Sequence, residues 1–151
     1  MLRARLNDSL KAAMKAKDQR AISTLRLILA ALKDRDIAAR SRGQTEGISD
    51  EEIVDMMQKM IRQRQDSIAL YEKGGRSELA QQEKEEIEVI QGFLPRQMDP
   101  AESQAAVEQA IADVGATSIK DMGRVMATLK ERYAGRMDFA KAGAMVKERL
   151  G

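Results

Sequence analysis

Apolar residues recur every three or four positions along most of this chain, which is the spacing of amphipathic α-helices. Leu2, Leu6 and Leu10 begin the first of these stripes. No segment alternates convincingly between apolar and polar residues as a half-buried strand would, and "EIEVI" at residues 86–90 comes nearest. The pattern therefore predicts an all-α protein.

Capping residues indicate where several of these helices begin and end. Ser49 followed by Glu52 is a capping-box pattern, and the acids of this first turn suit the helix dipole. Gly74 and Gly75 provide a stop, because glycine takes the left-handed cap conformation at little cost. In the C-terminal part, Ser118 and Asp121 are expected to start a helix that runs through Leu129.

The two prolines predict a boundary between two domains. Pro95 and Pro100 fall within six positions of each other, and proline costs about 3 kcal/mol inside a helix. Asp99 as N-cap with Pro100 at the first helical position makes a well-formed helix start. We therefore expect an N-terminal bundle of about four helices over 1–96, a small C-terminal three-helix domain over 97–151, and a linker at roughly 96–99.

Composition excludes several kinds of chemistry. The chain has no Cys and no His, which removes disulfides, thiolate nucleophiles and the commonest general base and metal ligand. Neither a glycine-rich phosphate loop nor a dinucleotide fingerprint occurs, so no cofactor and no metal is expected. The N-terminus lacks the apolar core of a secretory signal, and no apolar run is long enough to cross a membrane. These features predict a cytoplasmic protein without a membrane role.

Charge is distributed unevenly along the chain. Residues 1–42 contain 11 Lys and Arg against 4 Asp and Glu, a net charge of +7, whereas residues 43–100 contain 7 against 13, a net charge of −6. A basic N-terminal segment is compatible with RNA or with an acidic partner. The interpretation favoured by such patterning is that the two oppositely charged segments pack on each other.

Two clusters in the middle of the chain have both structural and functional interpretations. Glu83 and Glu86 lie three residues apart on one helical face, where they could form an acid/base pair or a structural ion-pair network with Arg64 and Arg26; we favour the network. Arg64 supports it, because it occupies a position where the stripe would place an apolar residue. The methionines at 56, 57 and 60 could form an adaptable binding surface, but their helical spacing favours core.

The stretch "DMGRVMATLKERYAGRMD", residues 121–138, places a glycine inside a helical pattern beside several cations. Gly123 stands next to the apolar stripe, where a missing side chain permits close approach of another helix or of a ligand backbone. Gly135 ends the helix, so Arg136 lies in a short basic turn that could contact phosphate. The alternative, favoured by composition alone, is a well-capped helical hairpin with solvated arginines.

Blocks of sequence along almost the whole chain resemble the GatB/YqeY family. "GRVM" at 123–126, "GRMD" at 135–138 and "VKERL" at 146–150 resemble the tail of the B subunit of glutamine-dependent tRNA amidotransferases. Four further blocks resemble the free-standing YqeY-like proteins: "MKAKD" and "STLRLILAALK" near the N-terminus, and "RQRQDS" and "EKEEIEVIQGFLP" in the middle. The resemblance implies two helical domains, the second shared with the amidotransferase tail, which helps to hold the tRNA body.

Carried over to this sequence, the resemblance implies RNA contacts at six positions: Gly123, Arg124, Lys130, Gly135, Arg136 and Lys147. The chain lacks the catalytic part of that subunit, whose activity is that of a carbon–nitrogen ligase with glutamine as amido-N-donor. We therefore expect a tRNA-binding or amidotransferase-like accessory protein without activity of its own, with tRNA and the amidotransferase or aminoacyl-tRNA machinery as partners. A protein-interaction module with no RNA role, and an enzyme using Glu83 and Glu86, are the alternatives.

Overall fold

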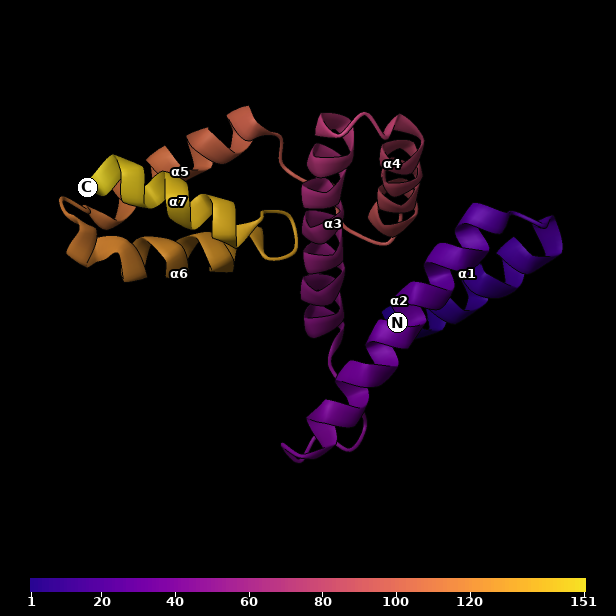
Figure 1. The fold of residues 1–151 in the computed structure, drawn as a ribbon. Helices are drawn as coiled ribbons and strands as arrows, with labels where there is room; N and C mark the ends of the chain where they lie inside the picture. Colours follow the sequence, from indigo (N-terminus) through magenta and orange to yellow (C-terminus); the bar gives the residue numbers. More distant parts are fainter. The chain divides into compact units, whose positions relative to one another are not determined.

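The computed structural model describes residues 1–151 and contains helices but no strand (Figure 1). This confirms the all-α prediction and, approximately, the number of helices. Seven α-helices and one short 3₁₀ helix follow one another along the chain: α1 Leu2–Ala16, α2 Gln19–Arg40, α3 Asp50–Lys73, α4 Ser77–Gln91, α5 Pro100–Val114, η1 Ile119–Asp121, α6 Met122–Tyr133 and α7 Phe139–Leu150. None of the helices is long and apolar enough to cross a lipid bilayer.

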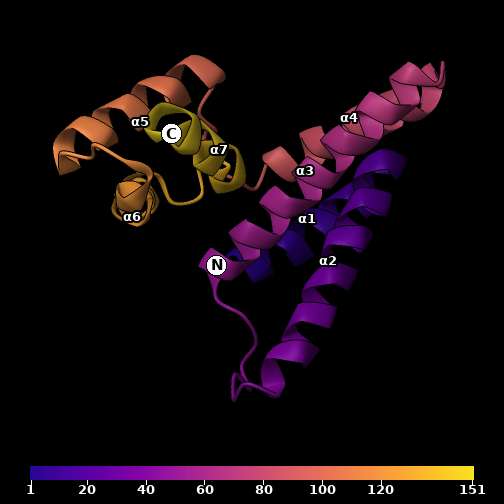
Figure 2. The ribbon, with the colours of Figure 1, turned by 60° about the vertical axis from the view of Figure 1, so that its left-hand side comes forward.

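The chain divides into two compact units, Met1–Leu94 and Pro95–Gly151, each with its own apolar core. The N-terminal unit is built from two helical hairpins, one of α1 and α2 and the other of α3 and α4, with α2 also packed against α4 (Figures 1 and 2). Its core is made of large side chains such as Leu6, Ile28 and Ile53, all fully buried. Met56, Met57 and Met60 belong to this core, as their spacing predicted, so they offer no exposed binding surface.

The C-terminal unit packs α5, α6 and α7 against one another around smaller side chains. Val107, Val125 and Val146 are buried together with Leu129, and Met137 and three alanines complete the core. Small side chains let helix axes approach closely, which is how so short a unit closes a core. The packing also fixes which faces of α6 and α7 remain exposed.

Most of the predicted capping residues cap as expected, but one helix start differs. The capping boxes of Ser49 with Glu52 and of Asp99 with Glu102 are both formed. Ser118 and Asp121 instead cap the 3₁₀ helix η1, and α6 begins one residue later at Met122. The Asp121 carboxylate accepts a hydrogen bond from the Thr117 backbone N–H at 2.9 Å, so it faces back along the chain instead of capping α6.

The segment expected to be a linker is bonded to the C-terminal unit. The Met98 backbone N–H donates to the Arg136 carbonyl at 2.9 Å, and the Gln97 side-chain amide donates to the Gly135 carbonyl at 2.7 Å. These bonds attach residues 97–98 to the turn between α6 and α7. The unit thus begins before its first helix.

Candidate nucleic-acid interface

The predicted RNA-binding residues lie on α6, on α7 and in the turn between them, and the two helices form an antiparallel hairpin (Figure 1). Gly143 of α7 faces α6, where an added Cβ would lie 3.6 Å from Met122 Cε and 3.9 Å from Met126 Cε, which is ordinary van der Waals contact. We call the neighbouring outer flanks of α6 and α7, marked by Gly123, Lys130, Gly143 and Lys147, the α6–α7 seam.

Two exposed lysines lie along this seam, one on each helix. Lys130 follows Met126 by four residues and Lys147 follows Gly143 by four, so each continues the row of side chains that meets the other helix. Because the helices are antiparallel, Lys147 lies toward the start of α6 and Lys130 toward the α6–α7 turn. Neither lysine forms an ion pair, and no Asp or Glu stands three or four residues from either lysine along its helix.

Between the two lysines the seam carries only small side chains, so no bulky group projects from the surface there. Gly123, Ala127, Ala140 and Ala144 are exposed and share the outer flanks of the two helices. An added Cβ at Gly123 would meet nothing within 4 Å, so the expectation that another helix packs closely there is wrong. The glycine that contacts α6 is Gly143, which was not among the predicted residues. Its signal was present in "KAGAM", where glycine stands among small residues at helical spacing.

Arg124 lies apart from the seam. Its guanidinium donates to Asp121 Oδ1 at 3.0 Å, and it is six residues from Lys130, which corresponds to about 120° around the helix. The structure therefore does not bring Arg124 together with Lys130, because the helical period carries its side chain to another face of α6.

Gly135 and Arg136 form the turn at one end of the seam. Gly135 has φ of 78°, a left-handed conformation that favours glycine. Arg136 donates from Nε to the Arg96 carbonyl at 3.1 Å, which holds its guanidinium against the segment that precedes α5. The hydrogen bond to Arg96 therefore holds the turn in place, and the Arg136 side chain remains partly exposed.

Other arginines of this unit are neutralised by acids of α5. Arg132 pairs with Asp113 at 2.8 Å, and Arg149 pairs with Glu108. Hydrogen bonds from Gln109 and Arg132 lower the pKa of Asp113, so this carboxyl stays ionised as a partner. On the side that faces α5 the arginines are thus paired with acids, whereas Lys130 and Lys147 of the α6–α7 seam form no ion pair.

The acidic cluster of the N-terminal unit forms an ion-pair network between α3 and α4. Arg64 Nε lies 3.0 Å from Glu86 Oε2 and 3.7 Å from Glu83 Oε2. Burial raises the pKa of Glu83, and the hydrogen bond to Glu86 and the charge of Glu86 raise it further. Arg26 is exposed on α2 and forms no ion pair with either glutamate. The cation that α2 offers to α4 is Arg20, which lies 3.5 Å from Glu85.

The comparison with known proteins matches almost the whole chain to a single family. A family model described as "Yqey-like protein" matches residues 3–150. Relatives named "Altered inheritance of mitochondria protein 41, mitochondrial" come from Lachancea thermotolerans, with 33% identity over 74% of this chain and 56% of the relative, and from Vanderwaltozyma polyspora, with 32% identity over 78% and 64%. The relative from Saccharomyces cerevisiae strain YJM789 is 30% identical over 70% of this chain. The chain thus spans between 54% and 64% of these relatives' length.

The names of these relatives contradict the cytoplasmic location expected from the sequence, because each names a mitochondrial protein. The expectation rested on the absence of a secretory signal. That absence does not bear on mitochondrial targeting, since mitochondrial presequences are amphipathic and need no apolar core.

Proposed function

This chain belongs to the YqeY-like protein family, and we propose that it is a non-catalytic accessory protein that binds tRNA through the α6–α7 seam. Support comes from the resemblance of its C-terminal unit to the amidotransferase tail. The observation that carries the proposal is the seam itself, where Lys130 and Lys147 are exposed without acidic partners on either side of small residues.

The seam suits a phosphate backbone for two physical reasons. Lysine binds phosphate as a point charge, and releasing condensed counterions from RNA favours each such contact. The open space in front of Gly123 lets a backbone approach the helix without meeting a side chain. With an aromatic content of only 3%, the chain has few platforms for stacking bases, so recognition would rest on backbone and shape. The amidotransferase or aminoacyl-tRNA machinery would then be its functional context.

The test is an anisotropy titration of fluorescently labelled tRNA over a range of salt concentrations. The variant Lys130→Ala/Lys147→Ala should bind tRNA more weakly. Because two phosphate contacts are lost, the negative slope of log association constant against log salt concentration should become shallower by about 1.4 to 1.8. The matched control Lys59→Ala/Lys73→Ala removes two exposed lysines from α3 and should bind as the wild type does. Equal binding by all three proteins would rule out the seam as the RNA site.

A protein-interaction role remains the second candidate, because the N-terminal unit carries a basic surface of its own. The enzyme alternative has less support. Glu86, one of its two carboxylates, is buried and paired with Arg64.

A further inference from the structure

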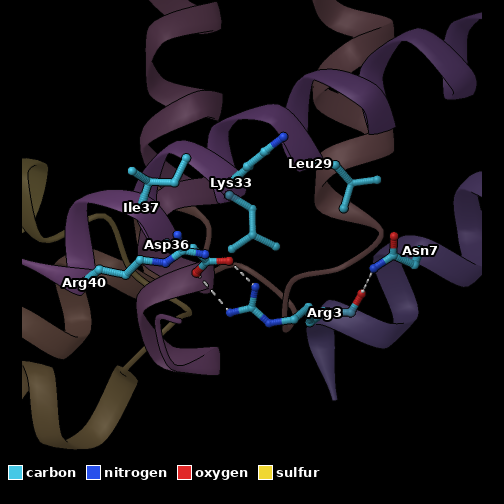
Figure 3. A pocket seen from close by; sticks show the side chains of 8 residues that line it. Arg3, Asn7, Leu29, Lys33, Asp36, Ile37 and Arg40 are labelled. Atoms are coloured by element: carbon cyan, nitrogen blue, oxygen red, sulfur yellow. Dashed lines mark hydrogen bonds and ion pairs between the residues drawn. The ribbon is translucent and has the colours of Figure 1, made fainter. Parts of the chain in front are cut away.

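A shallow pocket of about 420 Å³ lies between α1 and α2 of the N-terminal unit (Figure 3). Its walls combine an apolar floor of Leu29 and Leu32 with polar and charged side chains. The lining also includes Arg3, Lys33, Asp36, Ile37 and Arg40.

The single carboxylate of the pocket is already satisfied within the unit. Both terminal guanidinium nitrogens of Arg3 donate to Asp36 (Figure 3). The Ile48 backbone N–H donates to Asp36 Oδ1 at 2.9 Å. The hydrogen bond from Arg3 is the main cause that lowers the pKa of Asp36, so this carboxyl is ionised near neutral pH. Arg3 and Asp36 therefore neutralise each other, and Lys33 and Arg40 give the pocket its net positive charge.

Those two cations belong to a longer stripe on α2. Arg26, Lys33 and Arg40 follow one another at intervals of seven residues, so they lie on one face of the helix about 10.5 Å apart. All three are exposed, and none forms an ion pair. Between them lie apolar side chains, Leu29 partly exposed and Ile37 51% exposed.

The spacing and the apolar positions together select the kind of partner. A second helix laid along α2 repeats its own faces every seven residues, so acids at heptad spacing would meet the three cations in register. Its apolar residues would cover Ile37 and Leu29 as helix-in-groove anchors do. A phosphate backbone could satisfy the cations but has no apolar group to cover these two side chains.

We propose that the α1–α2 pocket and the adjoining face of α2 dock an acidic amphipathic helix from a partner protein. Acidic side chains of that helix pair with Arg26, Lys33 and Arg40, and an apolar side chain enters the pocket beside Ile37. This site lies in the N-terminal unit and uses none of the residues assigned to tRNA.

The probe is a fluorescein-labelled synthetic helix of 21 residues with Glu at every seventh position, Leu three and four residues after each Glu, and Ala and Gln elsewhere. A peptide of the same composition with the Glu positions scrambled is its control, and a labelled single-stranded RNA is the competing ligand. By anisotropy the heptad peptide should bind full-length protein at least tenfold more tightly than the scrambled one. Equal affinity of the two peptides would overturn the proposal.

Variants locate the binding and separate the two kinds of ligand. Lys33→Glu/Arg40→Glu should lower the affinity for the heptad peptide tenfold or more. The neutral pair Lys33→Gln/Arg40→Gln should also lower this affinity measurably, but by a smaller factor. Ile37→Ala should weaken the peptide about fivefold through its lost anchor, whereas Lys59→Glu/Lys73→Glu should leave it unchanged. RNA that binds more tightly than the peptide, responds to the charge variants and ignores Ile37→Ala would overturn the proposal in favour of a nucleic-acid surface.

Discussion

The two units of this protein use charge in opposite ways. In the N-terminal unit Arg64 and Glu86 lie inside the α3–α4 packing, with side chains only 13% and 8% exposed. In the C-terminal unit the core is entirely apolar and the ion pairs, such as Arg132 with Asp113, lie at the surface. The difference shows that one unit depends on a paired charge in its interior, whereas the other depends on the fit of small side chains.

The largest effect should follow from breaking the buried pair. Arg64→Ala leaves Glu86 buried without its cation, so it should lower the free energy of unfolding of the N-terminal unit by about 3–5 kcal/mol. Hydrogen exchange of the α3 and α4 backbone amides measures this unit separately from the other. Arg132→Ala, which opens an exposed pair in the C-terminal unit, should cost less than about 1 kcal/mol.

A double variant distinguishes the loss of a partner from the loss of packing. Arg64→Met/Glu86→Leu removes both charges and should recover most of the stability, because an apolar pair of similar volume can replace a buried ion pair. If Arg64→Ala costs no more than Arg132→Ala, the contrast between the units disappears.

A smaller effect is expected at the two helical glycines of the C-terminal unit. Gly123→Ala adds a methyl group in open space and removes the entropic cost of glycine, so it should stabilise the unit by about 0.5–1 kcal/mol. Gly143→Leu crowds the Met122 and Met126 side chains and should destabilise it by about 1–3 kcal/mol. Hydrogen exchange of the α6 and α7 amides gives both values, and a stabilising Gly143→Leu would show that the contact between α6 and α7 does not need a small residue at this position.

The smallest effects should appear as opposite pH dependences of two glutamates. The pKa of Glu83 is raised above its usual 4.5, mainly by burial, so its contribution to stability is present below 4.5 and is lost as the pH rises through the folded value. The pKa of Glu102 is lowered to about 2, mainly by its hydrogen bonds from Arg96. Its contribution is present above 4.5 and is lost as the pH falls toward 2.

NMR titration of the side-chain carboxyl carbons measures both groups in one experiment. Arg96→Ala should move the pKa of Glu102 from about 2 toward 4.5, and Arg64→Ala should raise the pKa of Glu83 further because a nearby positive charge is lost. Glu83→Gln should flatten the pH dependence of the N-terminal unit's stability above pH 4.5 while leaving the pKa of Glu102 unchanged. A pKa of Glu83 below 4.5 in the wild type would contradict the assignment.

The helices and most of their ends were predictable because they depend on local sequence. Ser49 with Glu52, and Asp99 with Pro100, determine their caps within one turn of chain. Arg64 was also predictable as a partner of the glutamates, because it interrupts the apolar stripe of its own helix. These features need no knowledge of how the helices pack.

Features that depend on which faces meet could not be predicted in this way. Arg26 and Arg20 both lie on α2, and only the packing of α2 against α4 decides that Arg20 reaches Glu85. Likewise Gly123 and Gly143 look alike in sequence, and only the neighbouring methionines distinguish a packing glycine from an open one. The α6–α7 seam follows from that packing and not from the basic turn alone.

The bonds between residues 96–98 and the α6–α7 turn have a consequence for transplanting the C-terminal unit into another protein. Arg96, Gln97 and Met98 all bond to that turn. A gene fusion that joined a foreign sequence directly to α5 would deprive the turn of these partners. A transplanted unit must therefore begin at Pro95, so that it keeps the few residues ahead of its first helix.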